Sequence, residues 1–153
     1  MPAVGINHIS IPTRDLEESA RFYTELLGAE PIASPNFGAQ VLWLRIGEAQ
    51  IHLLHDSEGG GGLRHFGVTV DDLAEVYERG RTAGALAPNA NGHHFWELPD
   101  GVVQLYLRDP SGNLLEVNAR DSASLPASVR SDLRALADVQ PQSEENLRAR
   151  LLA

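Results

Sequence analysis

The feature that most constrains this chain is an internal repeat, in which one strand-and-helix pattern occurs twice. The segment NHISIPTRDLEE at 7–18 aligns with RHFGVTVDDLAE at 64–75, so that His8 and His65 coincide. In both copies a short apolar strand is followed by Asp-x-x-Glu. That pattern is typical of a helix N-terminus, because the aspartate accepts from free backbone N–H groups. The repeat predicts two copies of one supersecondary unit.

Both copies continue with the same order of elements. Periodic apolar residues predict a helix from Leu16 to a stop at Gly28. A second helix is predicted from Leu73 towards Gly84, and Gly80 weakens it. The sequence therefore predicts the α+β class, with two tandem βαβββ modules. Turn-forming residues divide the rest of each copy into three strands. In the first copy these are expected at 30–34, 39–46 and 49–55, with a turn at 35–38. In the second copy they are expected at 94–98, 102–108 and 114–119.

Composition changes along the chain suggest where the modules begin and end. We place the first module at residues 1–57 and the second at 64–120. Between them, the Gly-rich run at 58–63 has the composition of a flexible linker. Residues 121–153 are expected to form a short helical tail, with one helix before Pro141 and another after it. No chemistry is apparent in this tail.

Absences in the composition exclude several classes of chemistry. The chain of 153 residues has no cysteine, and each of its 12 basic residues is an arginine. Thiolate ligands and lysine Schiff bases are therefore excluded, so a metal must be bound by His, Asp, Glu or amide oxygen. The net charge of −9 without a basic stripe argues against nucleic acid, and the chain has no long apolar run. We also expect no secretory signal. We expect a cytoplasmic protein with a small-molecule substrate and no membrane or nucleic acid partner.

Four polar residues are expected on the strand faces opposite the apolar side chains, because strand side chains alternate. They are His8, His52, His65 and Glu116, on the first and last strands of the modules. A single strand histidine is most often structural or exposed, and a lone charge on an inner face is costly to desolvate. The coincidence of His8 and His65 instead favours one shared divalent cation. The expected core ligands are His8, His65 and Glu116. His52 is expected as a further ligand, with Gln50 on the same face as its rival.

Three segments of the chain, NHISIPTRDLEESARFYTELLGAE, RHFGVTVDDL and YLRDPSGNLLEVN, carry a resemblance to a known family. They resemble the vicinal oxygen chelate superfamily, which includes glyoxalase I, methylmalonyl-CoA epimerase, fosfomycin-resistance transferases, extradiol dioxygenases and bleomycin-resistance proteins. The resemblance implies that the two modules form a shared curved-sheet cup around one metal site. Pairing of the modules within one chain and exchange between chains both occur in this superfamily, and we expect a homodimer.

The resemblance also implies which residues act in the site. The first and last strands of both modules supply ligands in this family, which maps onto His8, His65 and Glu116. If His52 also binds, the site has three histidines and one glutamate. If it does not, two histidines and one carboxylate remain, as in iron(II) oxygenases. Tyr106 stands where extradiol dioxygenases and fosfomycin-resistance enzymes have a tyrosine that reaches the substrate, with an ordinary strand tyrosine as the alternative. Such ligands suit Fe2+, Zn2+, Ni2+ and Mn2+ alike.

We therefore expect a divalent-metal-dependent enzyme of the glyoxalase type, which is an isomerase, epimerase or lyase. Its small substrate would chelate the metal through adjacent oxygens. The expected catalytic residues are Glu116, Tyr106 and His52, with His52 as the candidate base if it leaves the metal. Two alternatives stay open: an iron(II) extradiol-type dioxygenase on a catechol-like substrate, and a non-catalytic antibiotic-binding resistance protein. An apolar pocket is expected to have an aromatic lining, with core packing as the alternative for the two tryptophans: Trp43, Phe95, Trp96 and Tyr106.

Overall fold

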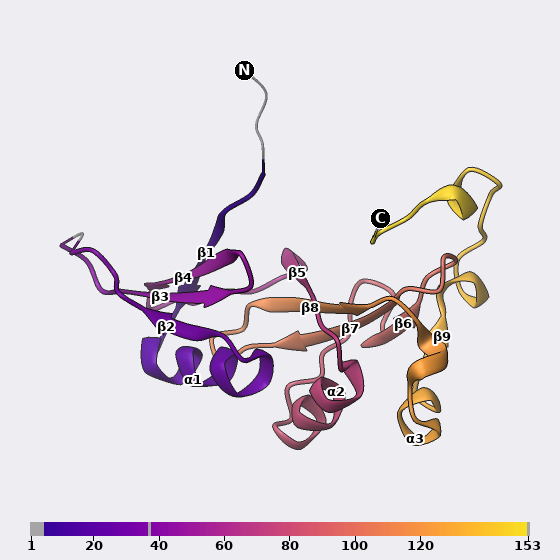
Figure 1. Ribbon diagram of the computed structural model, residues 1–153, viewed down its shortest axis with the longest axis horizontal. Coiled ribbons are helices and arrows are strands. Elements are labelled where there is room, and N and C mark those ends of the chain that lie inside the picture. The colour runs from indigo at the N-terminus through magenta and orange to yellow at the C-terminus, as the bar shows by residue number, and fades with distance from the viewer. Residues whose placement is uncertain (1–4, 37, 153) are drawn as a thin grey trace. The chain divides into compact units, whose positions relative to one another are not determined.

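The computed structural model describes residues 5–36 and 38–152, so Phe37 of the predicted turn lies outside the described residues. The chain forms two compact units. The first unit contains the chain up to Arg64 together with Asp109–Leu114. The second unit contains His65–Arg108 and the residues from Leu115 onward. The predicted order of two βαβββ modules is confirmed (Figure 1): β1 (His8–Thr13), α1 (Leu16–Leu27), β2 (Glu30–Ile32), β3 (Val41–Ile46), β4 (Ala49–His55), β5 (His65–Thr69), α2 (Leu73–Thr82), β6 (Phe95–Glu97), β7 (Val103–Arg108) and β8 (Leu114–Ala119).

The first unit contains a four-stranded sheet in the order β1-β4-β3-β2. β1 and β4 run parallel, whereas β3 is antiparallel to both β4 and β2. α1 begins where the Asp15 side chain accepts from the Glu18 N–H, and its cap Gly28 has a φ of 67°, which favours glycine. The helix contacts β3 and β4, whose Leu44 and Ile51 are buried. Because side chains alternate along β4, His52 belongs to the face opposite Ile51.

The turn between β7 and β8 belongs to this first unit. Asp109 in that turn accepts from the Tyr23 hydroxyl at 2.8 Å and from the backbone N–H groups of Ser111 and Asn113. The Gly-rich run packs against the same turn, where a Cβ added to Gly60 would lie 1.9 Å from Asn113 Oδ1. Glycine is needed here for close approach of two backbones. The Gly-rich run is therefore packed against this turn, and its role as a linker between the modules stays a prediction from the sequence.

The second unit has a sheet with the order β5-β8-β7-β6-β9, which repeats the topology of the first sheet and adds one strand, β9 (Arg134–Ala135). α2 begins where the Asp72 side chain accepts from the Glu75 N–H. Gly80 is buried in this helix, and a Cβ there would lie 2.4 Å from Leu107 Cδ2 on β7. The residue that weakens the helix pattern in the sequence therefore lets α2 approach the sheet.

The C-terminal segment contains short helical elements, as the sequence predicts, including α3 (Ala127–Arg130), and it adds one strand that the sequence did not predict. β9 pairs in parallel with β6, and Trp96 lies opposite Arg134. A helix as short as α3 gains little stability from its own hydrogen bonds. The residues of β9 therefore pair with the edge strand β6 instead of extending the helix. No helix among the described residues is long and apolar enough to cross a bilayer. The segment contains α3 (Ala127–Arg130), β9 (Arg134–Ala135) and 3₁₀ turns at Ser122–Ser124, Leu136–Asp138 and Asn146–Arg148.

Candidate functional site

The second unit gathers a carboxylate, a phenol, an amide and an imidazole around β8. This strand lies between β5 and β7, so Glu116 is flanked by side chains from both neighbours. Tyr106 donates to Glu116 Oε2 at 2.5 Å, and Gln104 Nε2 donates to Glu116 Oε1 at 2.8 Å. His65 Nε2 lies 3.2 Å from Glu116 Oε2. The structure thus brings together three predicted site residues and adds Gln104 to them.

Burial makes the carboxylate of Glu116 dependent on these partners. Glu116 is 6% exposed and Tyr106 is 5% exposed. A buried carboxylate is costly unless its oxygens are hydrogen-bonded, and both oxygens of Glu116 accept from neutral donors. Burial, followed by the hydrogen bond to Glu116 and its negative charge, raises the pKa of Tyr106 well above its ordinary value. Tyr106 therefore keeps its proton and acts as a donor at neutral pH.

Gly67, which has no side chain, lies next to Glu116. Gly67 is on β5, and a Cβ there would lie 3.3 Å from Asn118 Nδ2 and 3.6 Å from Glu116 Oε1. Asn118 is buried, yet its Oδ1 has no hydrogen-bond partner within the part of the chain that the structure describes. Buried acceptors are normally satisfied. The orphaned oxygen is the kind of group that an additional polar ligand would satisfy.

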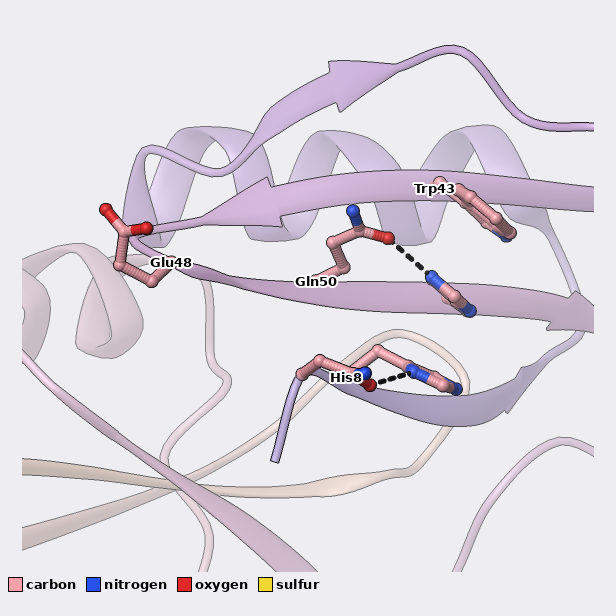
Figure 2. A pocket seen from close by; sticks show the side chains of 6 residues that line it. His8, Trp43, Glu48 and Gln50 are labelled. Atoms are coloured by element: carbon pink, nitrogen blue, oxygen red, sulfur yellow. Dashed lines mark hydrogen bonds between the residues drawn. The ribbon is translucent and has the colours of Figure 1, made fainter. Parts of the chain in front are cut away.

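In the first unit, the imidazole of His52 is stacked between the rings of Trp43 and His8, which are both labelled in Figure 2. β4 pairs with β1 and β3, which sets His52 opposite Ser10 and Trp43. The His52 ring is stacked on Trp43 with centroids 4.1 Å apart, and on His8 with centroids 4.3 Å apart. Its Nε2 lies 2.8 Å from Gln50 Oε1. The ring of His52 is therefore held on both faces and at one edge.

These side chains belong to an open pocket of about 460 Å³. Burial, followed by the charge of His8, lowers the pKa of His52 below its ordinary value. His52 is therefore neutral at neutral pH, as both a general base and a metal ligand must be. His8 Nδ1 lies 2.6 Å from Asn7 Oδ1, which orients the second imidazole. The pocket lining comprises Asn7, His8, Trp43, Glu48, Gln50 and His52.

The pair of His65 and Glu116 fits two neighbouring ligands of one divalent ion. Metal–ligand distances of about 2.0–2.2 Å place adjacent atoms of a tetrahedral site roughly 3.4 Å apart. The separation of His65 Nε2 and Glu116 Oε2 is 3.2 Å. The rings of His8 and His52 are instead nearly parallel, with 18° between their planes, so their in-plane lone pairs do not converge. One ring would have to turn for both to bind one ion, and ligation by His8 or His52 stays a prediction.

Two aromatic side chains that were expected in an apolar pocket belong to the core instead. Phe95 and Trp96 are 0% and 1% exposed, and Trp96 Nε1 donates to the carbonyl oxygen of His93. Tyr106 is also buried, against Glu116. Trp43 does line the pocket of the first unit. Core packing, which was the alternative from the sequence, therefore describes Trp96 but not Trp43.

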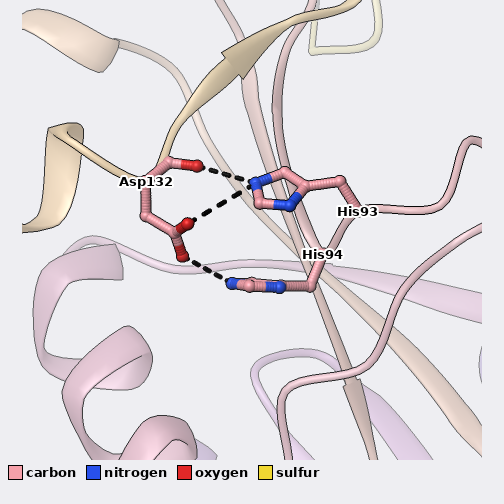
Figure 3. A group of neighbouring side chains, drawn as sticks. All are labelled: His93, His94 and Asp132. Atoms are coloured by element: carbon pink, nitrogen blue, oxygen red, sulfur yellow. Dashed lines mark hydrogen bonds and ion pairs between the residues drawn. The ribbon is translucent and has the colours of Figure 1, made fainter.

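A further cluster, which the sequence did not predict, joins His93 and His94 to Asp132 (Figure 3). The adjacent histidines are visible in the sequence, but only the pairing of β6 with β9 brings Asp132 to them.

Gln104 was also missed as a site residue. Its signal is the alternation along β7, which places it on the same face as Tyr106.

The chain is similar to known proteins in both sequence and fold. Residues 5–117 match the family model for the Glyoxalase/Bleomycin resistance protein/Dioxygenase superfamily. The ethylmalonyl-CoA/methylmalonyl-CoA epimerase of Cereibacter sphaeroides is 28% identical over 127 residues, covering 73% of this chain and 95% of that protein. The mitochondrial methylmalonyl-CoA epimerase of Homo sapiens is 30% identical over 83 residues, covering 44% of this chain and 47% of that protein, or about half its length. The lactoylglutathione lyase structure from Agrobacterium tumefaciens has a TM-score of 0.59 and 24% identity, covering 77% of this chain and 95% of that chain.

Proposed function

Because the chain belongs to the glyoxalase/bleomycin resistance protein/dioxygenase superfamily, we propose that it is a divalent-metal-dependent epimerase or isomerase. The reaction would move a proton at a carbon next to a carbonyl group. The observation that carries this proposal is the buried carboxylate of Glu116, which lies 3.2 Å from His65 and accepts from Tyr106 and Gln104. The epimerases among the relatives support proton transfer as the reaction class.

Within this proposal, His65 and Glu116 would hold the metal, with His8 as the third ligand expected from the sequence. A bound divalent cation would supply Lewis acidity that stabilises negative charge on adjacent substrate oxygens. Tyr106 and Gln104 fix the carboxylate of Glu116 by donating to both of its oxygens. Such outer hydrogen bonds orient a ligand and tune its basicity.

We assign the role of general base to His52 rather than a place among the ligands. Its lowered pKa keeps the imidazole neutral, and the stacked rings of Trp43 and His8 fix its plane. Gln50 fixes one ring nitrogen at 2.8 Å, which leaves the opposite edge of the ring to take a proton. Gln50 then remains as the candidate for a further metal ligand.

The names of the relatives suggest the substrate class to test first. A 2-alkylmalonyl-CoA has a carboxylate oxygen and a thioester carbonyl oxygen that can chelate one metal, and the carbon between them has an acidic proton. We propose this class of substrate for the chain. The open pocket beside His52 and Trp43 would receive the substrate carbon.

The test is exchange of the α-proton in D2O, followed by NMR, with methylmalonyl-CoA and ethylmalonyl-CoA as substrates. The protein is supplied in turn with Fe2+, Zn2+, Ni2+ and Mn2+, under anaerobic conditions for iron. We expect metal-dependent exchange that is lost in Glu116→Ala and kept in His55→Ala, because His55 is an exposed histidine at the end of β4.

Metal-loaded protein that leaves the α-proton unexchanged in both substrates would overturn the proposed reaction. Oxygen uptake with a catechol panel would then assign the chain to the iron(II) dioxygenases. Tight binding of an antibiotic by metal-free protein would instead assign it to the non-catalytic resistance proteins.

A further inference from the structure

Two histidines and one aspartate meet at the point where the C-terminal segment joins the second sheet. His93 and His94 directly precede β6, and Asp132 lies just before β9. β6 and β9 run parallel with Trp96 opposite Arg134, so the residues two positions earlier, His94 and Asp132, arrive at the same sheet edge. The cluster is therefore a consequence of strand register rather than an accident of exposed side chains.

The side chains of this cluster point toward one another (Figure 3). His94 Nε2 lies 2.6 Å from Asp132 Oδ2. His93 Nε2 lies 2.7 Å from the backbone oxygen of Asp132 and 3.7 Å from its Oδ1. One nitrogen from each histidine and one carboxylate oxygen all lie within 4.8 Å of one another. The His93 side chain is 8% exposed and that of Asp132 is 34% exposed, so the cluster is shielded yet open on one side.

The electrostatics of the cluster favour a cation. In the described part of the chain, the carboxylate of Asp132 lies within 4.0 Å of the nitrogens of His93 and His94, and no arginine forms an ion pair with it. Tyr77 donates to Asp132 Oδ2 at 2.9 Å and orients the carboxylate from outside. This is the arrangement found around ligating carboxylates, where outer hydrogen bonds fix the ligand.

We propose that His93, His94 and Asp132 form a second binding site, for a divalent cation of the zinc type, separate from the site around Glu116. Two imidazoles and one carboxylate are ligands that zinc accepts, with water in the fourth position. The role of the ion would be structural, because it would fasten the C-terminal segment to the body of the second unit.

Binding requires only small movements of the side chains. Adjacent ligands of a tetrahedral zinc ion lie roughly 3.4 Å apart, so His94 and Asp132 must separate by less than about 1 Å. Each neutral imidazole can carry its proton on Nδ1 and present the lone pair of Nε2 to the metal. The direct hydrogen bonds of the metal-free chain are thereby exchanged for metal–ligand bonds.

The experiment measures zinc binding in the full chain after the first site has been removed. The background protein carries His65→Ala and Glu116→Ala, and Zn2+ binding is followed by equilibrium dialysis. We expect one zinc per chain in this background. Tyr77→Phe removes a residue that hydrogen-bonds a ligand, and it should weaken zinc binding roughly 10–100-fold. Asp132→Asn changes a ligand itself, and it should weaken zinc binding by more than this. Asp138→Asn, which changes an exposed aspartate of the same segment, should leave the affinity unchanged.

A second readout follows the position of the C-terminal segment. Zn2+ should slow tryptic cleavage after Arg134 in the background protein, and it should have no effect once Asp132→Asn is present. If Asp132→Asn fails to fold, as judged by thermal melting without metal, His94→Ala replaces it, because His94 is more exposed than His93. A background protein that binds no zinc would overturn the proposal, as would equal affinities in Asp132→Asn and Asp138→Asn.

Discussion

The two modules place a histidine at the same position of their first strands, yet these histidines have different partners. His8 is stacked on the neutral ring of His52, which is itself stacked on Trp43. His65 instead lies beside the carboxylate of Glu116, which Tyr106 hydrogen-bonds. The repeat reproduces the backbone topology in both sheets, whereas the residues on the neighbouring strands decide the chemistry of each polar face.

This difference suggests a division of roles between the modules. The second module has a buried anion with fixed donors, which suits a metal ligand. The first module has a neutral imidazole of lowered pKa beside an open pocket, which suits proton transfer. Under the proposed function, the first module would supply the base and the second module would supply an anionic metal ligand.

The largest expected effect comes from His52→Gln, which tests whether the first module supplies a base or a ligand. Glutamine keeps a hydrogen-bonding side chain but cannot take a proton at neutral pH. We expect kcat to fall roughly 10²–10⁴-fold while the metal content stays at the wild-type level. His55→Gln serves as the matched control, because His55 is exposed on the same strand. Loss of metal in His52→Gln would make His52 a ligand and remove the contrast between the modules.

The next effect concerns stability in the first unit. Gly60→Ala places a Cβ 1.9 Å from Asn113 Oδ1 and 3.1 Å from Asn113 Cα, so the turn must shift. We expect the free energy of unfolding to fall by about 1–3 kcal/mol, measured by urea denaturation. Gly61→Ala is the matched control, since a Cβ there meets nothing within 4 Å. Equal stability of the two variants would contradict the close packing of the Gly-rich run.

A smaller effect is expected from Tyr106→Phe in the second unit. The substitution removes the donor to Glu116 Oε2 but leaves Gln104 on the other oxygen. We expect metal to be retained and kcat/KM to fall about tenfold. This is the smaller end of the roughly 10–100-fold range for losing a residue that hydrogen-bonds a metal ligand. Tyr77→Phe, measured in parallel, should keep the activity because Tyr77 contacts Asp132 instead. An unchanged kcat/KM in Tyr106→Phe would show that the hydrogen bond has no catalytic consequence.

The smallest effect is a pH dependence that both units share. Burial is the main cause that raises the pKa of each of the three tyrosines, to about 12 for Tyr77 and well above the ordinary value for Tyr23 and Tyr106. Their folded pKa values exceed the unfolded value of about 10, so their contribution to stability is complete below pH 10 and is lost as the pH rises through the folded values. Absorbance at 295 nm should show no tyrosine ionising near pH 10 in the folded chain, and all three in denaturant. A folded tyrosine titrating near pH 10 would contradict this.

Much of the second unit's site could be predicted from the sequence, because the repeat and strand alternation fix faces and neighbours. His65, Glu116 and Tyr106 were expected there, and they do lie together. The same alternation places His8 and His52 on one face, but it cannot say whether two imidazoles stack or converge. That choice depends on Trp43, whose ring fills the space on the far side of His52.

Other features could not be predicted, because they depend on contacts between distant segments. Asp132 reaches His93 and His94 through β9, a strand of only two residues with no alternation to recognise. The requirement for glycine at residue 60 follows from a turn that comes much later in the chain. The homodimer and the cytoplasmic location stay predictions from the sequence.

Metal content tests the central claim most directly, namely that Glu116 is the anionic ligand of the proposed site. Elemental analysis would compare anaerobically purified chains that all carry Asp132→Asn, which removes the second proposed site. We predict one divalent ion per chain in this background, none after adding Glu116→Ala, and one after adding Glu144→Gln at an exposed position. Retention of a stoichiometric ion by the chain with Glu116→Ala would contradict the account.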